Sequence, residues 1–420
     1  MGASADKNAA GAGRDEGGLS GWFRKRFPWD QLMDDHVTGY YAPKNFNWFY
    51  VFGSLALLAL VIQIVTGIFL TMSYKPSAAE AFNSVEYIMR DVEWGWLIRY
   101  MHSTGASLFF AVVYIHMFRA LLYGSYQKPR ELIWIFGMLI YLCMSAEAFF
   151  GYLLPWGQMS YWGAQVIVSL FGALPVIGEP LVEWIRGDYF ISDVTLNRFF
   201  ALHVIALPLV LLGLVVAHIL ALHEVGSNNP DGVEIKKHKG PDGKPLDGIP
   251  FHPYHTAKDV PAWIIFAMVF ALIVFFAPEM GGFFLEYANF EPANPLKTPD
   301  HIAPVWYFTP FYAILRAVPD KLGGVLLMGA AMFALFLLPW LDRSPVRSIR
   351  YKGPLFKIAL TVFVISFVML GWLGLQPATT VYTILARVFT ILYFAFFVLM
   401  PIYSKIDKTK TPPDRITYHG

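Results

Sequence analysis

Residues 97–122 read LIRYMHSTGASLFFAVVYIHMFRALL, an apolar stretch that is long enough to cross a bilayer as a helix and yet carries two histidines. His102 and His116 lie fourteen residues apart, which corresponds to about 21 Å of helical rise. At about 100° per residue, this spacing falls about 40° short of four full turns, so both imidazoles lie on one face. Ionisable side chains inside a span are costly and usually functional. The stretch therefore predicts a membrane helix with two functional levels at different depths.

A second apolar stretch repeats this arrangement. Residues 196–223 read LNRFFALHVIALPLVLLGLVVAHILALH, with His203 and His218 fifteen residues apart. Neutral imidazole is a good ligand of haem iron. Two histidines in each of two spans, at nearly equal spacing, predict two haems stacked across the membrane, each held by one histidine from each helix. The alternative is four histidines that form hydrogen bonds between packed helices.

Arginines stand just outside three of these histidines: Arg99, Arg119 and Arg198. Guanidinium groups pair well with carboxylates, so we expect these side chains to bind haem propionates. The alternative for each is an interfacial side chain whose charged end reaches the membrane surface.

The composition indicates a polytopic all-α membrane protein, because 56% of the residues are hydrophobic and only 15% are charged. Eight apolar spans are expected, near 48–73, 97–122, 131–154, 197–221, 260–278, 322–341, 354–374 and 381–403. The net charge of +2 gives no indication of a nucleic-acid partner, and we expect none. The single cysteine, Cys143, excludes an internal disulfide or thiolate cluster.

Basic residues predict the orientation. They concentrate at both termini and in the connections that contain Lys128, Lys236 and Arg347, whereas the opposite connections are rich in acids. The positive-inside rule then predicts cytoplasmic termini. The second and fourth spans both run inward, so His102 and His203 share the outer level. His116 and His218 share the inner level.

Glycines repeat the same spacing in the first and third spans. Gly53 and Gly67 lie fourteen residues apart, as do Gly137 and Gly151. In the predicted orientation, Gly53 and Gly137 fall at the inner histidine level, and Gly67 and Gly151 at the outer level. Glycine permits the close approach of a flat ligand, although small residues also serve helix packing. The first four spans thus predict a bundle around two haems.

The chain divides into three predicted parts. Residues 1–47 form a cytoplasmic segment with an interfacial helix, of which the first 20 residues are expected to be disordered. Residues 48–259 form the diheme four-helix bundle. Residues 260–420 form a C-terminal four-helix domain.

Several motifs together resemble one family. They are RYMHSTGAS, HMFRALLYGSY, GYLLPWGQMSYWGA, LNRFFALH, the segment from His218 through GSNNP, FHPYHTAKD and PVWYFTPFYAILR. From about residue 30 to 405, the chain resembles cytochrome b, the membrane core of the quinol–cytochrome c oxidoreductase, or respiratory complex III. The resemblance implies that the outer histidine pair binds a low-potential haem b and the inner pair a high-potential haem b.

The resemblance also implies two quinone sites, of which residues 260–420 would complete the outer, quinol-oxidising one. The outer, quinol-oxidising site would involve Tyr152, Met159, Trp162, Gly163, Pro304 and Tyr307. The inner, quinone-reducing site would involve His223, Lys258 and Asp259. An imidazole and a carboxylate beside a lipophilic pocket can deliver protons to a reduced quinone. On sequence alone, the same residues also fit ordinary interfacial polar groups.

The function that the resemblance implies is a Q cycle. Ubiquinol is oxidised near the outer face, one electron passes to a Rieske iron–sulfur protein, and the other crosses both haems to reduce ubiquinone near the inner face. Protons are thereby moved across the membrane. The implied partners are the Rieske protein, cytochrome c1, the lipid bilayer and a second copy of the complex.

One departure from the family concerns the outer site. The usual Pro-Glu-Trp-Tyr motif is here Pro304, Val305, Trp306 and Tyr307, so the glutamate credited with accepting a quinol proton is missing. Another acceptor is therefore expected, and the acids placed for this role are Glu147, Glu279 and Glu286. We favour Glu147, because an acid inside a span is costly unless it is used. Water or Tyr307 is the remaining alternative.

Two other functional classes stay open. A diheme membrane anchor of a quinone-linked dehydrogenase would also carry paired histidines, but it needs neither eight spans nor the long aromatic connection at 278–321. A transporter without haem could use intramembrane histidines as proton relays.

Overall fold

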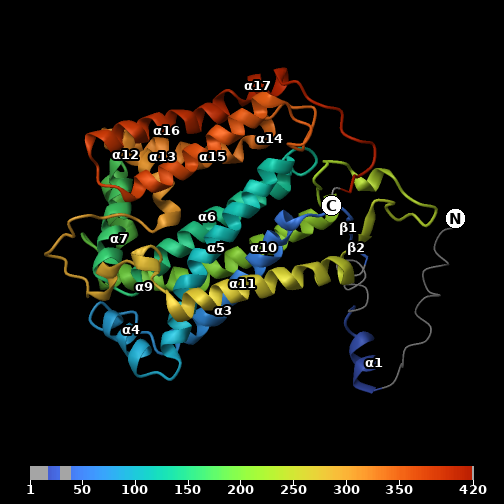
Figure 1. Cartoon of the computed structure of the whole chain (residues 1–420). Helices are drawn as coiled ribbons and strands as arrows, with labels where there is room; N and C mark the ends of the chain where they lie inside the picture. The colour runs from blue at the N-terminus through green and yellow to red at the C-terminus, as the bar shows by residue number, and fades with distance from the viewer. Residues whose placement is uncertain (1–17, 29–38, 419–420) are drawn as a thin grey trace.

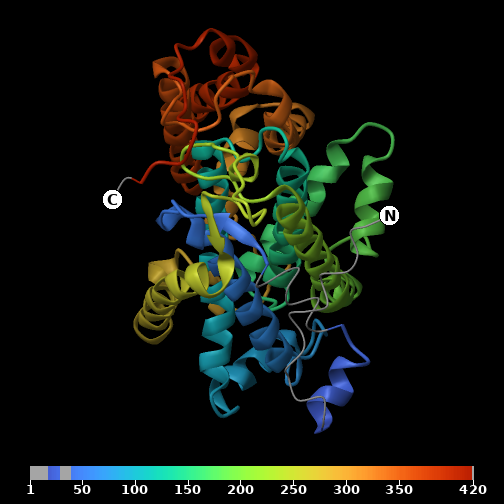
Figure 2. The ribbon, with the colours of Figure 1, turned by 90° about the vertical axis from the view of Figure 1, so that its right-hand side faces the viewer.

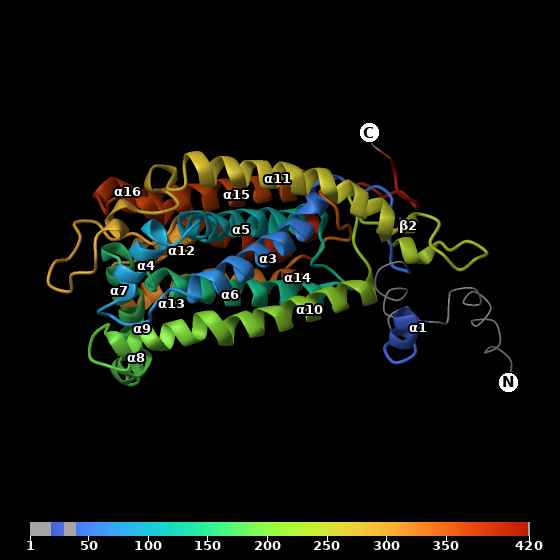
Figure 3. The same ribbon diagram turned by 90° about the horizontal axis from the view of Figure 1, so that it is seen from below.

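Long apolar helices run side by side through the length of the molecule (Figures 1 and 3). The computed structural model describes residues 18–28 and 39–418. Within these residues, seven helical segments are long and apolar enough to cross a membrane. They are Trp48–Thr71, Gly95–Tyr123, Glu131–Leu153, Asp193–Val225, Phe251–Phe276, Pro354–Leu375 and Thr380–Val398. The predicted all-α, multi-pass architecture is confirmed.

The spans are built from named elements. In the first half they are α3 (Phe52–Thr71), α5 (Gly95–Tyr123), α6 (Glu131–Leu153), α9 (Asp193–Ala201) with η4 (Leu202–Ala206), and α10 (Leu207–Val225). In the second half they are η6 (Phe251–His255) with α11 (Thr256–Phe276), α15 (Pro354–Leu375) and α16 (Thr380–Val398). The helix α5 ends where Gly124 adopts φ +63°, a left-handed conformation that glycine accepts at no steric cost.

The predicted span at 322–341 is not one continuous helix. The structure has α13 (Lys321–Phe336), of 16 residues, followed by the single turn α14 (Leu338–Leu341). Sixteen residues rise about 24 Å, which is less than the roughly 30 Å of a bilayer core. Pro339 has no N–H to continue the ladder, so the helix breaks just before it. Seven of the eight predicted spans therefore have full length in the described residues.

Short elements gather at the two ends of the bundle. One end holds α4 (Ala81–Arg90), α7 (Gln158–Leu170), α8 (Gly178–Arg186), α9 and α12 (Thr309–Ala317), as Figures 1 and 3 show. The opposite end holds β1 (Tyr41–Pro43), which pairs antiparallel with β2 (Gly248–Pro250), and α17 (Met400–Ile406). On the predicted orientation, the first is the outer end and the second the cytoplasmic end.

The N-terminal segment is described only in part. The helix α1 (Gly18–Arg24) includes residues 18–20, which we had predicted to be disordered. The prediction of disorder for residues 1–17 lies outside the described residues. The exposed aromatic side chains Trp22 and Phe23 on α1 are typical of an interfacial helix.

The C-terminal helices lie beside the bundle of the first spans and do not surround it (Figure 2, orange to red against blue and cyan). Within the first bundle, α3 packs on α5 and α6 packs on α10. In the second half, α12 packs against α13, α15 and α16. A single cluster of buried apolar side chains joins the halves, and Phe110 of α5 stacks on Tyr307 with ring centroids 3.8 Å apart.

A buried polar network connects the two halves at the end of the bundle that holds β1 and β2. Asp342 and Lys352 form an ion pair in which both side chains are fully buried. Arg130 and Arg347 both contact the carboxylate of Glu234. The two guanidinium groups hold the pKa of Glu234 below its usual value, although burial alone would raise it. These contacts fix the loop after α10 against the segment between α14 and α15.

Candidate functional site

The four intramembrane histidines lie in two pairs. The ring centroids of His102 and His203 are 6.2 Å apart, and those of His116 and His218 are 6.4 Å apart. Each pair joins α5 to the span formed by α9, η4 and α10. These are the pairs that the orientation predicted from basic residues, and the two pairs are separated along α5 by fourteen residues, or about 21 Å.

A π-helical turn explains why the second spacing is fifteen residues. His203 lies in η4, where the backbone bonds skip one residue more than in an α-helix. Pro208 has no N–H to donate to the carbonyl of Val204, and the N–H of Leu207 bonds instead to the carbonyl of Leu202. The additional residue in this turn lets His203 and His218 face the same helix as their partners. Pro208 was the signal in the sequence that could have predicted this turn.

Each histidine packs against a glycine of a neighbouring helix, in the pairs His102–Gly67, His203–Gly151, His116–Gly53 and His218–Gly137. A Cβ on Gly67 would lie 3.3 Å from Cε1 of His102, and a Cβ on Gly151 would overlap the ring of His203. The glycines thus lie at the levels that their spacing predicts. A side chain in place of Gly151 would displace the imidazole of His203, whereas a Cβ at Gly53, Gly67 or Gly137 would come within 3.3–3.4 Å of the facing ring.

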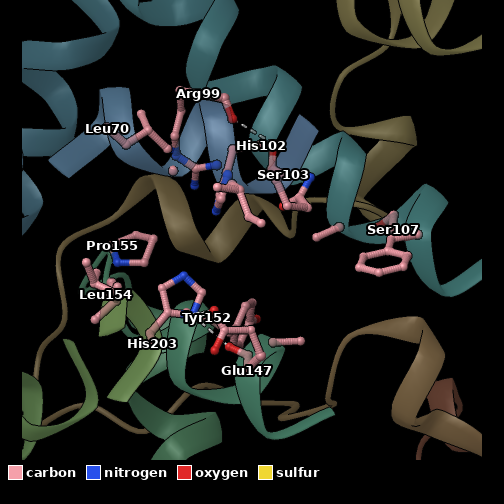
Figure 4. Close-up of a pocket in the computed structure, with 18 of the residues that line it drawn as sticks. Leu70, Arg99, His102, Ser103, Ser107, Glu147, Tyr152, Leu154, Pro155 and His203 are labelled. Carbon is pink, nitrogen blue, oxygen red and sulfur yellow. Dashed lines mark hydrogen bonds and ion pairs between the residues drawn. The ribbon is translucent and has the colours of Figure 1, made fainter. Parts of the chain in front are cut away.

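A cavity of about 290 Å³ surrounds the outer pair. Its lining is mostly apolar, with a few polar groups that converge from several helices, as in most cofactor sites. Arg99 and His102 face His203 and Glu147 across the cavity in Figure 4. Of the residues that we predicted for the site, the lining contains Gly67, Arg99, His102, Glu147, Gly151, Tyr152, His203 and Tyr307.

The outer imidazoles are oriented through Nδ1. Oγ1 of Thr66 lies 2.9 Å from Nδ1 of His102, and the carbonyl oxygen of Glu147 lies 2.8 Å from Nδ1 of His203. When Nδ1 of His203 donates to this carbonyl, Nε2 carries the lone pair that a metal needs. No group of three or more histidine, cysteine or acidic side chains that could hold a bare metal ion is found among the described residues. Histidine pairs fit a group that brings its remaining ligands itself, as a haem does.

Glu286 belongs to a hydrogen-bonded triad at the edge of the cavity. The hydroxyl of Tyr152 donates to Oε2 of Glu286 at 2.9 Å, and the amide of Asn289 donates to both, at 3.0 Å and 3.2 Å. Burial raises the pKa of Glu286 to about 7. Burial and the neighbouring Glu286 also raise the pKa of Tyr307, which therefore stays protonated. Asn289 was missed in the sequence because nothing marks it apart from other loop amides.

The remaining acids lie differently. Glu147 faces the cavity with Gly151, as predicted, but Oε1 of its carboxyl group lies 3.1 Å from Nδ1 of His203. The carboxyl group of Glu279 accepts a hydrogen bond from the hydroxyl of Tyr100, at the long distance of 3.5 Å. The structure thus places Glu147 against an imidazole and Glu286 among groups that can pass a proton.

The other residues predicted for the outer site stand behind the cavity. Gly163 of α7 packs against the ring of Tyr152, and Nε1 of Trp162 donates to the carbonyl of Asn294 at 3.2 Å. The lining residues do not include Met159, Trp162, Gly163 or Pro304. Val305, which replaces the usual glutamate, lines the cavity and is buried.

The three arginines occupy different environments. Arg99 lines the outer cavity. Arg119 lies 3.2 Å from Nδ1 of His116, with its guanidinium 5.0 Å from the ring centre of Tyr50. Arg198, by contrast, is exposed and donates to the carbonyl of Trp184, away from the cavity. Its short distance in sequence from His203 suggested a propionate partner, but its side chain turns toward the outer loop.

The residues predicted for the inner site approach the inner pair from separate helices. The ring of His223 stacks on Tyr40, with centroids 4.3 Å apart. Asp259, in the first turn of α11, hydrogen-bonds Ser54 of α3. Ser54 follows Gly53, which packs on His116, so Asp259 lies near the inner pair. Lys258 is exposed.

Comparison with known proteins decides the family. Residues 37–226 match the family described as cytochrome b/b6/petB, and residues 292–394 match cytochrome b(C-terminal)/b6/petD. A cytochrome b of Allochromatium vinosum is 65% identical over 406 residues, which cover 94% of this chain and 97% of that protein. The chain belongs to the cytochrome b family. Membership of this family implies that it binds b-type haem.

Further relatives agree with this assignment. A cytochrome b of Rhodospirillum rubrum is 51% identical, with 94% of this chain and 95% of that protein covered. A protein named cytochrome b/c1 of Bradyrhizobium diazoefficiens is 46% identical and matches 94% of this chain and 56% of its own length. The solved structure of a hyperthermophilic respiratory complex III contains a chain that superposes with a TM-score of 0.86 and 42% identity, covering 93% of this chain and all of that one.

Proposed function

We propose that this chain oxidises quinol at the outer cavity and reduces quinone near the inner histidine pair, within a bacterial respiratory complex III. The observation that carries the proposal is the presence of two histidine pairs at two depths of one helical bundle. Electrons released at one level can then reach the other, and protons leave and enter on opposite sides. The result is a Q cycle that moves protons across the membrane.

The residues present fit two b-type haems. His102 and His203 would hold the outer, low-potential haem, and His116 and His218 the inner, high-potential haem. Each pair lies against two of the four glycines, and the missing side chains would permit the close approach of a flat ligand. Arg99 and Arg119 lie close enough to serve carboxylate groups of the cofactors. When bound, each haem would accept and donate one electron at its iron.

At the outer site, the structure favours Glu286 over Glu147 as the acceptor of a quinol proton. Oxidation of quinol releases two protons and two electrons. The Glu286 carboxylate can take one proton from the quinol hydroxyl, with Tyr152 and Asn289 holding it in place. A pKa of about 7 is well matched to a general base at neutral pH. Tyr307 and Phe110 would form the apolar wall behind the quinol ring.

At the inner site, His223 and Asp259 would deliver protons to the reduced quinone. His223 is five residues beyond His218, and Tyr40 supports its ring. Asp259 stands on α11 beside the glycine that packs on His116. Lys258, exposed at the cytoplasmic end, would feed protons to this pair. Ubiquinone is the proposed substrate at both sites.

The proposed partners are a Rieske iron–sulfur protein and cytochrome c1. The Bradyrhizobium relative bears cytochrome c1 in its name, and the solved relative is part of a respiratory complex III. The outward faces of α10 and α11 expose many large apolar side chains, which suit lipid or a second copy of the chain. A homodimer of the complex with cytoplasmic termini, in the inner membrane, completes the proposal.

The decisive experiment is purification of the chain from membranes with its partners. We expect an iron–sulfur protein and a c-type cytochrome to co-purify, and a reduced b-type α-band in the optical spectrum. Quinol–cytochrome c reductase activity should be sensitive to inhibitors of each quinone site. Absence of the α-band would exclude haem and favour a transporter, and co-purification with a dehydrogenase instead would favour a membrane anchor.

A further inference from the structure

Two residues of α6 occupy equivalent places in front of the two histidine pairs. Glu147 stands one helical turn before Gly151, and Ile133 stands one turn before Gly137. The two glycines pack on the outer and the inner pair, respectively. The helix thus presents the same backbone pattern at both levels, but with a carboxyl side chain at one and an aliphatic side chain at the other.

At the outer level, the carboxyl group of Glu147 contacts the imidazole directly. Its Oε1 lies 3.1 Å from Nδ1 of His203, while its backbone carbonyl lies 2.8 Å from the same atom. The other oxygen, Oε2, is buried and has no hydrogen-bond partner among the described residues. His203 is therefore the side-chain partner that justifies placing this acid inside a span, where it is otherwise costly.

At the inner level, the contact is weaker. The carbonyl of Ile133 approaches the His218 ring, but Nδ1 of His218 is buried and has no hydrogen-bond partner among the described residues. The Ile133 side chain is buried and apolar and offers no acceptor. The two histidines of the second span therefore differ at Nδ1, where His203 has both a backbone carbonyl and a carboxyl oxygen beside it and His218 has neither as a hydrogen-bond partner among the described residues.

We infer that Glu147 is a positioning residue that tunes the outer haem ligand and so separates the reduction potentials of the two levels. A carboxyl oxygen at Nδ1–H raises the basicity of a ligating imidazole, as carboxylate partners do in other metal sites. A more basic ligand stabilises the oxidised iron and lowers its potential. This inference rests on the proposed ligation by His203. It gives Glu147 a role other than proton acceptance from quinol.

Redox titration of both haems in the purified complex tests the inference. In Glu147→Gln and Glu147→Ala, we expect the potential of the outer haem to rise. A tenfold change in the reduction equilibrium corresponds to about 59 mV for one electron, and we expect a shift of this order. The reduction potential of the inner haem should not change. In Ile133→Glu, the inner haem should shift in the opposite direction, to lower potential.

Two further measurements distinguish tuning from damage. The electron paramagnetic resonance signal of the oxidised outer haem should change in Glu147→Gln while its haem content stays that of the wild type. Glu131→Gln, at the cytoplasmic start of the same helix, is the matched control and should leave both potentials unchanged.

Three outcomes would overturn the inference. They are an unchanged outer potential in both Glu147 variants, an equal shift of both haems, and an inner potential in Ile133→Glu that stays or rises. If both Glu147 variants lost the outer haem, the potential of the inner haem in Ile133→Glu would test the inference instead. A lower potential would support the inference, and an unchanged or higher potential would refute it. Absence of haem in the wild-type complex would instead refute the proposed function.

Discussion

At the residue scale, the four histidines make the sharpest prediction. His102→Leu and His203→Leu should each remove the same haem component, because leucine keeps the volume but offers no ligand to iron. His116→Leu and His218→Leu should each remove the other component. The presence of each haem component is measured from optical spectra that are recorded while the purified variants are reduced stepwise. The pairing would be refuted if His102→Leu and His218→Leu abolished the same spectral component.

Glu286 makes a second prediction at this scale. Its carboxylate must be deprotonated to accept a proton, so with a pKa of about 7 the wild-type rate of quinol oxidation should rise as pH increases through neutrality. Glu286→Gln should slow that rate by about 100-fold, the lower end for loss of a general base, and should remove this pH dependence. Both haems should remain. The measurement is the rate of b-haem reduction by quinol between pH 5 and 9, ranging about two pH units on each side of neutrality.

The matched control for this variant is Glu279→Gln, which changes an acid in the same connection. The carboxyl group of Glu279 accepts only a long hydrogen bond, of 3.5 Å, from the hydroxyl of Tyr100 among the described residues. It should retain the wild-type rate and pH profile. If Glu286→Gln kept the wild-type rate and pH dependence of quinol oxidation, Glu286 would not be the proton acceptor. If only Glu147→Gln lost this rate, the acceptor would be Glu147, as the sequence predicts.

Residue-scale predictions from the sequence succeeded where the signal was periodic. Histidine and glycine spacings placed eight residues at two levels, because a helix converts spacing into position. Glu286 could not be placed in this way. It meets Tyr152 across 134 residues of chain, through a connection without periodicity. The propionate contact that we predicted for Arg198 rested on its proximity in sequence to His203. Such proximity does not determine the direction in which a long side chain points.

At the scale of elements, the spans were predictable from apolar length, but two interruptions were not. Pro339 ends α13 early, and Pro208 requires the π turn η4. Both follow from the missing N–H of proline, which hydropathy does not register. The early end of α13 shortens a span, whereas the π turn brings His203 and His218 onto the same face of their span.

The π turn gives a prediction of its own. Deletion of Ile205 together with Pro208→Ala should convert η4 into regular α-helix and reduce the spacing of the two histidines to fourteen residues, as in α5. Both haems should then be retained. Haem content per chain, from the optical spectrum, is the measurement.

The control for the π turn is deletion of Leu212 from the regular part of α10, with Pro208 kept. The π turn is then still required, and removal of one residue rotates His203 against His218 by about 100°. This variant should lose a haem component. Equal haem content in the two deletions would show that the π turn does not determine the alignment.

At the scale of the whole molecule, the orientation predicted from basic residues puts two quinone sites on opposite sides of one bundle. The outer cavity is lined partly by residues around His203, next to α9, and His223 lies in the last turn of α10. The helix α10 runs from the end that holds α9 toward the β1–β2 ribbon (Figures 1 and 3). Substitutions at one end should therefore affect one quinone reaction and leave the other intact.

His223→Leu tests this separation. Leucine removes the imidazole that would deliver a proton to the reduced quinone, so reoxidation of the inner haem should slow about 100-fold. Reduction of the b haems by quinol at the outer cavity should stay at the wild-type rate, because about 21 Å between the histidine levels and more than one further turn of helix separate the sites. Stopped-flow reduction and reoxidation, each with an inhibitor of the opposite site, resolve the two reactions. Tyr40→Phe, which keeps the stacked ring beneath His223, is the matched control and should reoxidise normally. Loss of outer reduction in His223→Leu would mean that the two ends of the bundle are not functionally separate, and that the orientation is wrong.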